Sequence, residues 1–411
     1  MSFILELKWR GLLKNATNED KINIFEQKRG TAYIGFDPSA DSLHLGNYVM
    51  ILVLRYLKKF NHKAIAVIGG ATGQVGDPSG KKTERTMLDV HNAKNNAAAI
   101  KKQLIKYADV EVFNNIEIYG KMSVLEFLRN VGKLINVNYL LEKDIIKSRI
   151  DFGISYTEFS YNLMQGYDFA WLYANKSVSM QIGGSDQWGN ITTGIEMIRK
   201  LYGDQNNACG LTISLLTKTD GTKFGKTEGG AIYLDKNRTT PFAMYQFLLN
   251  QTDADVGKML KFLTMLSEKQ IKDVMDEHIH EPSKRIAQMK LTQIIVTDIH
   301  GEVEYQRCLK ISNTLFKGNV ENLSLDEIKD ALSSLPSFKA TESAYNIVDL
   351  LVSCKACPSK SEARKLVEAN AIYVNNQLIK SIDTIIKKSD ALHRNFTYIK
   401  KGKKNYFLVQ W

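Results

Sequence analysis

The sequence predicts an α/β protein whose first domain is built on a parallel sheet. Residues 31–36 and 64–69 are short apolar runs that end at or beside a glycine, and both read as buried strands. Between them, residues 44–60 carry apolar residues at helical spacing. A strand, a helix and a second buried strand form a βαβ unit, in which ligands bind at the carboxyl ends of parallel strands. This pattern predicts a Rossmann-like sheet, with a further strand near 179–182.

A helical region follows the predicted sheet. Strand patterns are scarce between 241 and 316, and helical periodicity recurs in three stretches, at 243–249, 256–266 and 285–300. Serine and proline then gather around 333–337, which indicates a connecting segment.

The C-terminal region has the pattern of a small α+β domain. Ser359 and Glu362 form a capping-box pattern at the start of a helix, and Asn370 is suited to close that helix in a left-handed conformation. Residues 372–374 and 377–379 read as strands joined by an Asn-Asn turn. We therefore expect a sheet domain, a helical domain, a linker and a small α+β domain, at 1–232, 233–320, 321–342 and 343–411.

Composition and charge favour a soluble protein with a polyanionic partner. Hydrophobic residues make up 44% of the 411 residues and charged residues 24%, as in ordinary globular domains. No window approaches the roughly 20 apolar residues of a membrane span, so we expect a cytoplasmic location and no membrane partner. The net charge is +11, and residues 343–411 alone hold 12 Lys/Arg against 5 Asp/Glu. A basic cluster at one end favours nucleic acid.

The cysteine pattern predicts neither a disulfide scaffold nor a metal centre. Cys354 and Cys357 form a C-x-x-C pair, but a zinc knuckle needs two further ligands, and the nearest candidate is His393. We expect two incidental thiols and no metal held by protein side chains.

The first segment with chemical character runs from Gly35 to Asn47, where a strand gives way to a helix. Backbone amides and the positive end of the helix favour phosphate there. His44 can donate to phosphate oxygens, Gly46 leaves room for an adenine, and Asn47 can bind a ribose or phosphate oxygen. Alone, this H-x-G-N pattern is weak, because a lone histidine is more often structural.

A glycine-rich segment over 69–81 follows the second strand. It is not a Walker A motif, because three residues rather than four separate Gly76 from Gly80. Its glycines permit close approach of a ligand, with Asp77 as an anionic contact. Lys81 and Arg85 are suited to meet departing phosphates.

Three further segments combine polar groups in unusual settings. Tyr161, Gln165 and Asp168 share one face of a predicted helix rich in aromatic residues, and buried polar groups of this kind favour a ligand pocket. In the segment 181–190, an acidic side chain after a glycine-rich strand end is suited to ribose hydroxyls. The loop over 223–227 carries two lysines that can close over a triphosphate.

Together these segments resemble a known family. His44-Leu45-Gly46-Asn47 looks like the HIGH signature of class I aminoacyl-tRNA synthetases, and Lys223-Phe224-Gly225-Lys226-Thr227 looks like their KMSKS loop in its bacterial tyrosyl form. The resemblance extends over essentially the whole chain, including a C-terminal region similar to the S4 RNA-binding module. It implies a bacterial-type tyrosyl-tRNA synthetase, acting on L-tyrosine, ATP with Mg²⁺, and tRNA(Tyr), and forming a homodimer.

The resemblance also implies roles for individual residues. The residues expected to bind tyrosine are Tyr33, Asp77, Tyr161, Gln165, Asp168 and Gln187. Those expected to bind ATP are Gly35, Asp37, Ser39, His44, Gly46, Asn47, Gly184, Asp186 and Lys226. Those expected to act on the transferred phosphates are His44, Asn47, Lys81, Arg85, Lys223, Lys226 and Thr227.

Some positions depart from the family pattern, and other functions stay open. Asn47 stands where many relatives have a second histidine, and Ile34 and Met50 stand where some carry small polar residues. A tryptophanyl enzyme is the nearest alternative, although Tyr33 and Asp168 favour tyrosine. The others are a small-molecule adenylating ligase, which the basic C-terminal region disfavours, and a non-catalytic RNA-binding relative, which the intact lysines disfavour.

Overall fold

The computed structural model describes residues 2–79, 89–217, 219, 221–222, 224–227, 230–317, 322–332, 336–402 and 405–411. The chain forms two compact units. The first contains residues 1–239 and 248–299, and the second contains residues 240–247 and 300–411.

A six-stranded sheet organises the first unit. In sheet order its strands are β1 (Leu13–Ala16), β6 (Cys209–Ile213), β5 (Val178–Gly184), β2 (Thr31–Phe36), β3 (Lys63–Ile68) and β4 (Glu111–Asn114). All neighbours are parallel except β1 and β6. From β2 the chain builds β3 and β4 on one side and then crosses to build β5 and β6 on the other. The sheet therefore has a topological switch point between β2 and β5, where open α/β sheets bind their ligands.

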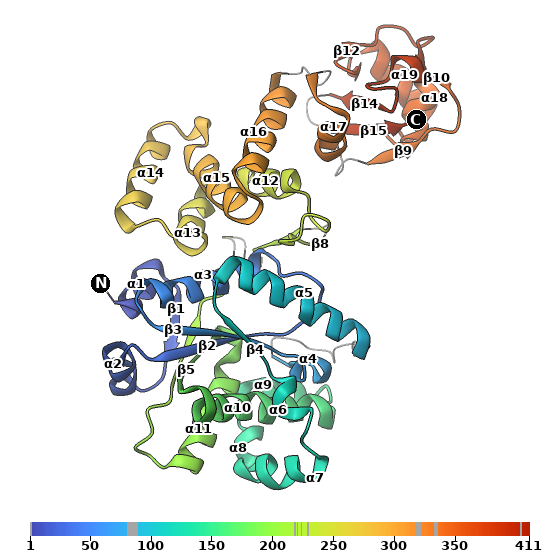
Figure 1. Ribbon diagram of the computed structural model, residues 1–411. Helices are drawn as coiled ribbons and strands as arrows, with labels where there is room; N and C mark the ends of the chain where they lie inside the picture. Colours follow the sequence, from blue (N-terminus) through green and yellow to red (C-terminus); the bar gives the residue numbers. More distant parts are fainter. Residues whose placement is uncertain are drawn as a thin grey trace. The chain divides into compact units, whose positions relative to one another are not determined.

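Helices cover both faces of this sheet. Figure 1 shows α3 (Leu45–Lys59) and α5 (Val90–Ala108) on one face, and α10 (Tyr156–Lys176) and α11 (Trp188–Tyr202) on the other. The remaining elements of this unit are α1 (Phe3–Arg10), α2 (Glu19–Lys28), α4 (Thr72–Val75), α6 (Ile116–Tyr119), α7 (Val124–Glu126), η1 (Phe127–Val131), η2 (Gly132–Leu134), α8 (Val137–Leu141), α9 (Asp144–Ile150), η3 (Ser185–Gln187), β7 (Lys226–Thr227), β8 (Gly230–Ala231), α13 (Asp253–Leu263), α14 (Glu268–His280), η4 (Pro282–Lys284) and α15 (Ile286–His300).

The elements that carry the predicted site form where the sequence places them. The strand predicted at 31–36 is β2, and the helix predicted at 44–60 is α3, which begins one residue after His44. Tyr161, Gln165 and Asp168 lie on α10, as their spacing predicts. The Rossmann-like parallel sheet is confirmed.

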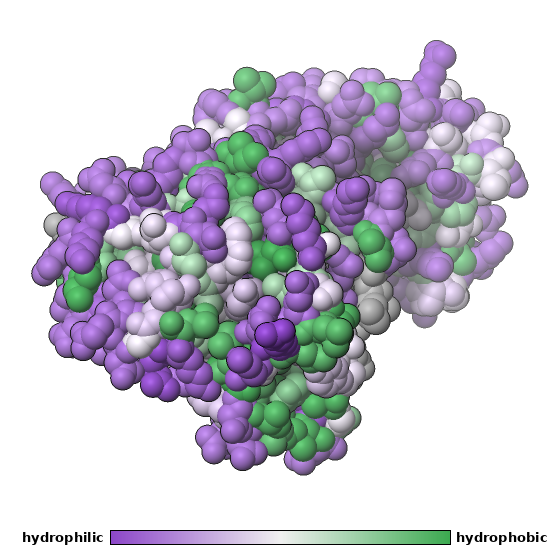
Figure 2. All heavy atoms as spheres, turned by 60° about the horizontal axis from the view of Figure 1, so that its bottom comes forward, coloured by the Kyte–Doolittle hydropathy of each residue, from purple (hydrophilic) through white to green (hydrophobic). Residues whose placement is uncertain are grey.

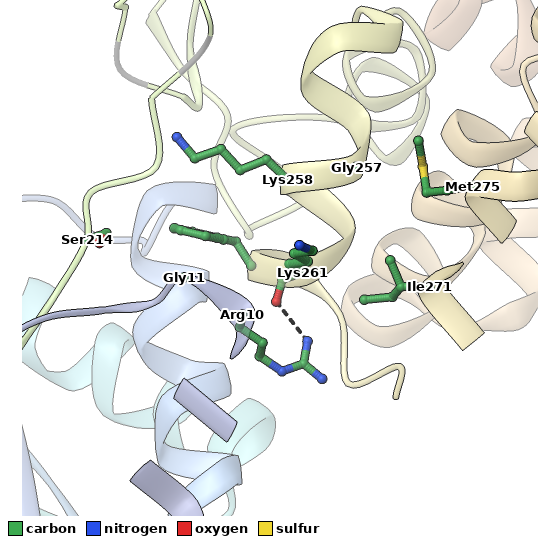
Figure 3. Close-up of a pocket in the computed structure, with 9 residues that line it drawn as sticks. Arg10, Gly11, Ser214, Gly257, Lys258, Lys261, Ile271 and Met275 are labelled. Atoms are coloured by element: carbon green, nitrogen blue, oxygen red, sulfur yellow. Dashed lines mark hydrogen bonds between the residues drawn. The ribbon is translucent and has the colours of Figure 1, made fainter. Parts of the chain in front are cut away.

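A buried arginine joins α1 to the end of α13. The Arg10 side chain is fully buried and pairs with Glu6. Its Nη1 donates to the carbonyls of Lys261 at 2.7 Å and Thr264 at 2.9 Å, and its Nη2 donates to the carbonyl of Leu266. Figure 3 shows it at the base of a cavity of about 570 Å³ beside α13. Because its donors are occupied in this way, Arg10 is a structural residue.

Replacing Arg10 with methionine should destabilise the first unit by about 3–5 kcal/mol, because a buried carboxylate and several helix-end carbonyls lose their partner. Urea unfolding followed by circular dichroism measures the change. The matched control is Arg199→Met, which removes an arginine from a half-exposed ion pair with Glu196 and should cost under about 1 kcal/mol. Equal shifts in the two variants would contradict the structural role of Arg10.

The second unit holds the C-terminal sheet. Its strands in order are β12 (Gln377–Leu378), β11 (Ile372–Val374), β14 (Phe396–Lys401), β15 (Asn405–Gln410) and β9 (Ser337–Lys339). The other elements are α16 (Glu302–Lys317), α17 (Leu325–Leu332), β10 (Ala344–Asn346), α18 (Ile347–Ser353), α19 (Lys360–Glu368), β13 (Ile385–Lys387) and η6 (Lys388–Asp390). Helix α12 (Pro241–Leu249) starts in this unit and ends in the first.

The local signals predicted in the C-terminal region are largely confirmed. Strands β11 and β12 pair through the turn Asn375-Asn376, whose φ angles are 45° and 67°, and Asn370 has a φ of 55°. Ser359 caps α19 by accepting from the Glu362 amide, but the Glu362 carboxylate meets Lys401 at 3.1 Å. The expected connecting segment contains α17 and β9, and β9 pairs in parallel with β15.

The two cysteines of the C-x-x-C pattern pack inside this unit. Cys354 and Cys357 are free, buried thiols within a hydrophobic cluster. Burial raises the pKa of the Cys354 thiol to about 11. Both side chains therefore act as small apolar groups in the core. No helix among the residues that the structure describes is long and apolar enough to cross a membrane.

Candidate active site

A cavity of about 410 Å³ opens at the carboxyl ends of β2 and β5, at the switch point of the sheet. The predicted residues that line it are Tyr33, Gly35, Asp37, Ser39, His44, Gly46, Asn47, Asp77, Tyr161, Gln165, Asp168, Gly184, Asp186 and Gln187. Lys81, Arg85 and Lys223 lie outside the described residues, as do the side chains of Lys226 and Thr227. The backbone of these last two forms β7.

His44 and Asn47 form the start of α3 together. The Nδ1 atom of His44 accepts from the amides of Gly46 at 3.0 Å and Asn47 at 3.3 Å, and the Asn47 side chain accepts from the His44 amide at 3.1 Å. This is a reciprocal capping box. Because Nδ1 is an acceptor, the proton of the neutral ring lies on Nε2.

Two glycines of the motifs are explained by neighbouring side chains. A Cβ atom at Gly46 would lie 2.8 Å from Cε1 of His44, so any side chain there would displace the ring. A Cβ atom at Gly184 would lie 2.6 Å from Oδ1 of Asp186. The structure thus shows one reason for Gly46, which is room for the His44 ring; room for an adenine stays a prediction.

One end of the cavity holds buried polar atoms that lack a partner. The hydroxyl of Tyr33, Oδ1 of Asp168 and Oε1 of Gln181 are buried and make no hydrogen bond with any residue that the structure describes. Oδ2 of Asp168 accepts from Nδ2 of Asn115 at 2.9 Å. Buried polar groups are costly without partners, so these atoms indicate a ligand with a polar group at this position.

Burial shifts the pKa values of Asp168 and Tyr33 at this end of the cavity. It raises the pKa of Asp168 to about 7, with the negative charge of Asp37 adding to the rise and the Asn115 hydrogen bond opposing it. Burial beside Asp168 also raises the pKa of Tyr33 well above its usual value. Tyr33 therefore stays a hydroxyl donor, while Asp168 is poised near neutral pH.

The other polar side chains of the cavity bind one another. Tyr161 donates to Oδ2 of Asp37 at 2.9 Å, and Nε2 of Gln187 donates to Oδ2 of Asp77 at 2.8 Å. Oε1 of Gln165 accepts from Asn190 at 2.7 Å. These pairs hold the carboxylates and amides in fixed directions at the cavity wall.

Three lining residues, Thr72, Asn115 and Gln181, had no role assigned from the sequence, nor had Asn190, which contacts the lining residues Gln165 and Gln187. Asn115 donates to both Thr72 and Asp168, and Asn190 donates to Gln165 and Gln187. Thr72, Gln181 and Asn190 lie within quoted motifs, where a role could have been sought. Asn115 follows β4 outside any motif, and only the sheet order brings it to the site.

The two apolar departures from the family pattern also line the cavity. Ile34 lies on β2 and Met50 on α3, and both belong to the cavity wall. They make the cavity wall apolar at these two positions.

The family comparison agrees with this geometry. Residues 26–317 match the family described as "tRNA synthetases class I (W and Y)", and residues 327–409 match the tyrosine–tRNA ligase SYY-like C-terminal domain. This chain belongs to the class I aminoacyl-tRNA synthetases. The tyrosine–tRNA ligase of Ureaplasma parvum is 52% identical over 410 residues, covering 100% of this chain and 99% of that protein.

More distant relatives carry the same name. The tyrosine–tRNA ligase of Geobacillus stearothermophilus is 44% identical over 419 residues and covers 100% of both chains. A crystal structure of a truncated mitochondrial tyrosyl-tRNA synthetase from Aspergillus nidulans aligns with a TM-score of 0.69 at 30% identity, covering 77% of this chain and 94% of that one. Within its class, the chain is a member of the tyrosine–tRNA ligases.

Proposed function

We propose that this chain joins tyrosine to tRNA(Tyr) in two steps at the cavity between β2 and β5. The tyrosine carboxylate attacks the α-phosphorus of ATP, and the bond to pyrophosphate breaks. A ribose hydroxyl of the 3′-terminal adenosine of tRNA(Tyr) then attacks the acyl carbon, and AMP leaves. Neither step needs a covalent bond to the protein, so catalysis consists of positioning and of stabilising charge on the phosphates.

The observation that carries this proposal is that two polar atoms at the buried end of the cavity, the Tyr33 hydroxyl and Oδ1 of Asp168, have no hydrogen-bond partner among the described residues. The Tyr33 hydroxyl donates to the phenol oxygen of the substrate, and the phenol hydroxyl donates to Oδ1 of Asp168. Both protein atoms lack a partner in the described structure, and a phenol supplies one acceptor and one donor. Phenylalanine would leave both atoms unpaired, which gives the cavity its specificity.

The remaining predicted site residues are assigned to the rest of the tyrosine substrate, to ATP and to the pyrophosphate. The residues assigned to the ammonium group of tyrosine are Asp77, Tyr161 and Gln165, with Gln187 near the carboxylate. Those assigned to ATP are Gly35, Asp37, Ser39, His44, Gly46 and Asn47, with Gly184 and Asp186 at its ribose. Those assigned to the pyrophosphate are Lys81, Arg85, Lys223, Lys226 and Thr227.

Magnesium is assigned to the phosphates of ATP, where its preference for phosphate oxygens and water places it. Among the described residues, no three His, Cys, Asp or Glu side chains gather as metal ligands. The ion would neutralise charge on the phosphates.

Pyrophosphate exchange into ATP tests the proposal, with tyrosine, tryptophan or phenylalanine added in separate reactions. We expect exchange with tyrosine alone. Exchange with tryptophan would keep the class of enzyme and overturn the specificity. The absence of exchange with all three would favour a non-catalytic RNA-binding protein.

The binding of tyrosine should weaken as the pH falls below 7. The raised pKa of Asp168, about 7, means that its carboxylate gains a proton in this range and no longer accepts from the phenol. Equilibrium dialysis of tyrosine between pH 6 and pH 8 measures this effect, and Asp168→Asn should show a flat profile. A parent profile as flat as that of the variant would contradict the role of Asp168.

The parts of the chain are assigned in the same way. Residues 1–232 are assigned to the catalytic domain, 233–320 to the helical domain and 343–411 to an S4-like domain that contacts tRNA. Residues 321–342 are assigned as the link between the last two, although β9 within them pairs with the C-terminal sheet. The excess of positive charge in this last region supports the assignment, because lysine and arginine neutralise phosphates. The use of tRNA favours a cytoplasmic location.

A homodimer is proposed from an exposed apolar surface of the first unit. Large hydrophobic side chains are exposed along α7, η1, α8, α9 and the start of α10. This apolar patch consists of Val124, Leu125, Leu128, Val137, Leu141, Ile150, Phe152 and Tyr156. Figure 1 places α7 and α8 at the lower end of this unit, and Figure 2, with that end turned forward, shows hydrophobic side chains gathered there. Large exposed apolar patches mark association surfaces.

Replacing Phe152 with glutamate should convert the dimer into a monomer, because a charge would be buried within the proposed contact. Sedimentation equilibrium measures the mass. The control is Ile279→Glu, which changes an equally exposed side chain, 67% against 71%, on α14. A parent protein that sediments as a monomer, or two variants that behave alike, would exclude the patch as the contact.

A further inference from the structure

Two buried charges meet at the start of α10, the helix that carries Tyr161 and Gln165 of the cavity wall, and neither lines the cavity itself. Arg149 is near the end of α9, and Glu158 is in the first turn of α10. Their side chains are 2% and 1% exposed. Nη2 of Arg149 lies 2.7 Å from Oε2 of Glu158, and Nη1 donates to Oε1 at 3.3 Å. The guanidinium thus makes one hydrogen bond and one close ionic contact with the carboxylate, because Oε2 accepts no hydrogen bond from the described residues. Nη2 also donates to the carbonyl of Gly153 at 3.3 Å.

The stability of the fold does not account for this pair. Removing two charges from water costs several kcal/mol per ion, and apolar residues of similar volume are often equally or more stable in such positions. What the pair supplies is direction, because the guanidinium is held at Glu158 by a charge-assisted hydrogen bond and at the carbonyl of Gly153 by a second one.

The ion pair fixes the orientation of the side of α10 that faces the cavity. Glu158 precedes Tyr161 by three residues and Gln165 by seven, so the three side chains share one side of the helix. Further along α10, partners from other elements hold this face, through Asp37 at Tyr161 and Asn190 at Gln165. In the first turn, the Glu158 amide is capped by Ser155, and the Glu158 side chain is held by Arg149.

The same contact closes the loop between the two helices. Residues 151–155 connect α9 to α10. Arg149 donates a hydrogen bond to the carbonyl of Gly153 in this loop and forms an ion pair with Glu158 on the helix. This loop carries Phe152 of the apolar patch, with Ile150 and Tyr156 on either side. The ion pair therefore stands between the patch and the helix that carries the tyrosine-binding side chains.

We propose that Arg149 and Glu158 are positioning residues for the tyrosine half of the cavity. They set the start of α10 so that Tyr161 and Gln165 face the ammonium group of the substrate. This inference rests on the proposed function. The ATP half is built from β2, α3 and β5, so the pair governs the binding of tyrosine and not that of ATP.

The test replaces both charges at once, so that neither is left buried and alone. In Arg149→Met/Glu158→Met, the KM for tyrosine in pyrophosphate exchange should rise by about 10- to 100-fold, because small misplacements in a site cost factors of this size. The KM for ATP should stay within about twofold, and the melting temperature should not fall, because a packed apolar pair replaces the buried ions. The matched control is Arg199→Met/Glu196→Met, which removes a half-exposed pair on α11 and should leave both KM values unchanged.

A second variant covers the case in which the double replacement does not fold. Arg149→Lys keeps the charge but loses the planar guanidinium that contacts Glu158 and Gly153 together. It should raise the KM for tyrosine by a smaller factor, at a melting temperature near that of the parent. An unchanged KM for tyrosine in either folded variant would overturn the proposal, as would an equal rise in the KM for ATP. If the parent protein itself shows no tyrosine-dependent exchange, the proposed function fails, and this result is distinct from an active parent with unaffected variants.

Discussion

Replacing His44 with alanine should slow the activation of tyrosine by about 10²–10³-fold, the loss seen when one preorganised donor to a developing charge is removed. In the structure, the His44 ring is held by two amides at Nδ1, so Nε2 points its proton in a fixed direction beside the start of α3. The affinity for tyrosine should stay near the parent value, because the proposed phenol site, Tyr33 and Asp168, lies on β2 and α10.

A control variant distinguishes a role of His44 in the activation rate from its role in capping α3. Alanine also removes the cap of α3, at a cost of about 1 kcal/mol. His44→Asn retains a capping side chain but lacks the reach of the imidazole. We expect His44→Asn to recover the melting temperature and not the rate, as measured by pre-steady-state formation of the adenylate. A variant that recovers both would show that the role of His44 is to cap the helix.

Replacing Asp168 with asparagine should weaken tyrosine binding by about 10- to 100-fold, the range for hydrogen bonds to a charged group. Phenylalanine makes no such bond, so the preference for tyrosine should fall by the same factor. Tyrosyl-tRNA synthetases reject phenylalanine by on the order of 10⁵, a value that comes from such enzymes and against which the loss can be compared. Pyrophosphate exchange with each amino acid gives the ratio of kcat/KM values.

The same variant should be more stable than the parent at pH 8. The folded pKa of Asp168, about 7, lies above the usual carboxyl value, so the stabilising effect of its proton is complete below about pH 4 and is lost as the pH rises through 7. Asparagine does not ionise. The free energy of unfolding of the variant should therefore exceed that of the parent by up to about 4 kcal/mol at pH 8, and this difference should vanish towards pH 4. Thermal melts at the two pH values measure it. An Asp168→Asn protein that melts below the parent at pH 8 would contradict the buried charge.

The sequence predicted the elements that local patterns determine. Strand β2 and helices α3 and α10 follow from apolar periodicity, and the residues brought together in the cavity follow from their places at strand and helix ends. Asn115 was missed because its contact with Asp168 joins residues 53 apart in the chain, which no local pattern reveals. The capping role of Asn47 could have been read from the sequence, because a helix start with a side-chain acceptor three residues on is a local signal.

Long-range strand pairing explains the clearest difference from the sequence prediction. Serine and proline around 333–337 indicated a connection, yet β9 begins at Ser337 and joins the sheet edge beside β15. A three-residue strand has no periodicity of its own, and its partner lies about seventy residues later in the sequence. Such a strand is defined by the edge it binds, so only the folded sheet identifies it.

Strand β15 also determines when the second unit can fold during its synthesis. It lies between β14 and β9 in the sheet, so β9 has no neighbour until the ribosome has released residues 405–410. Domains fold largely as they emerge, at about 5–20 residues per second, and the first unit can complete its sheet at β6 well before this point. The C-terminal sheet is therefore the last part of the described structure to form, and a nascent chain stalled before residue 405 would hold a formed cavity between β2 and β5 without this sheet.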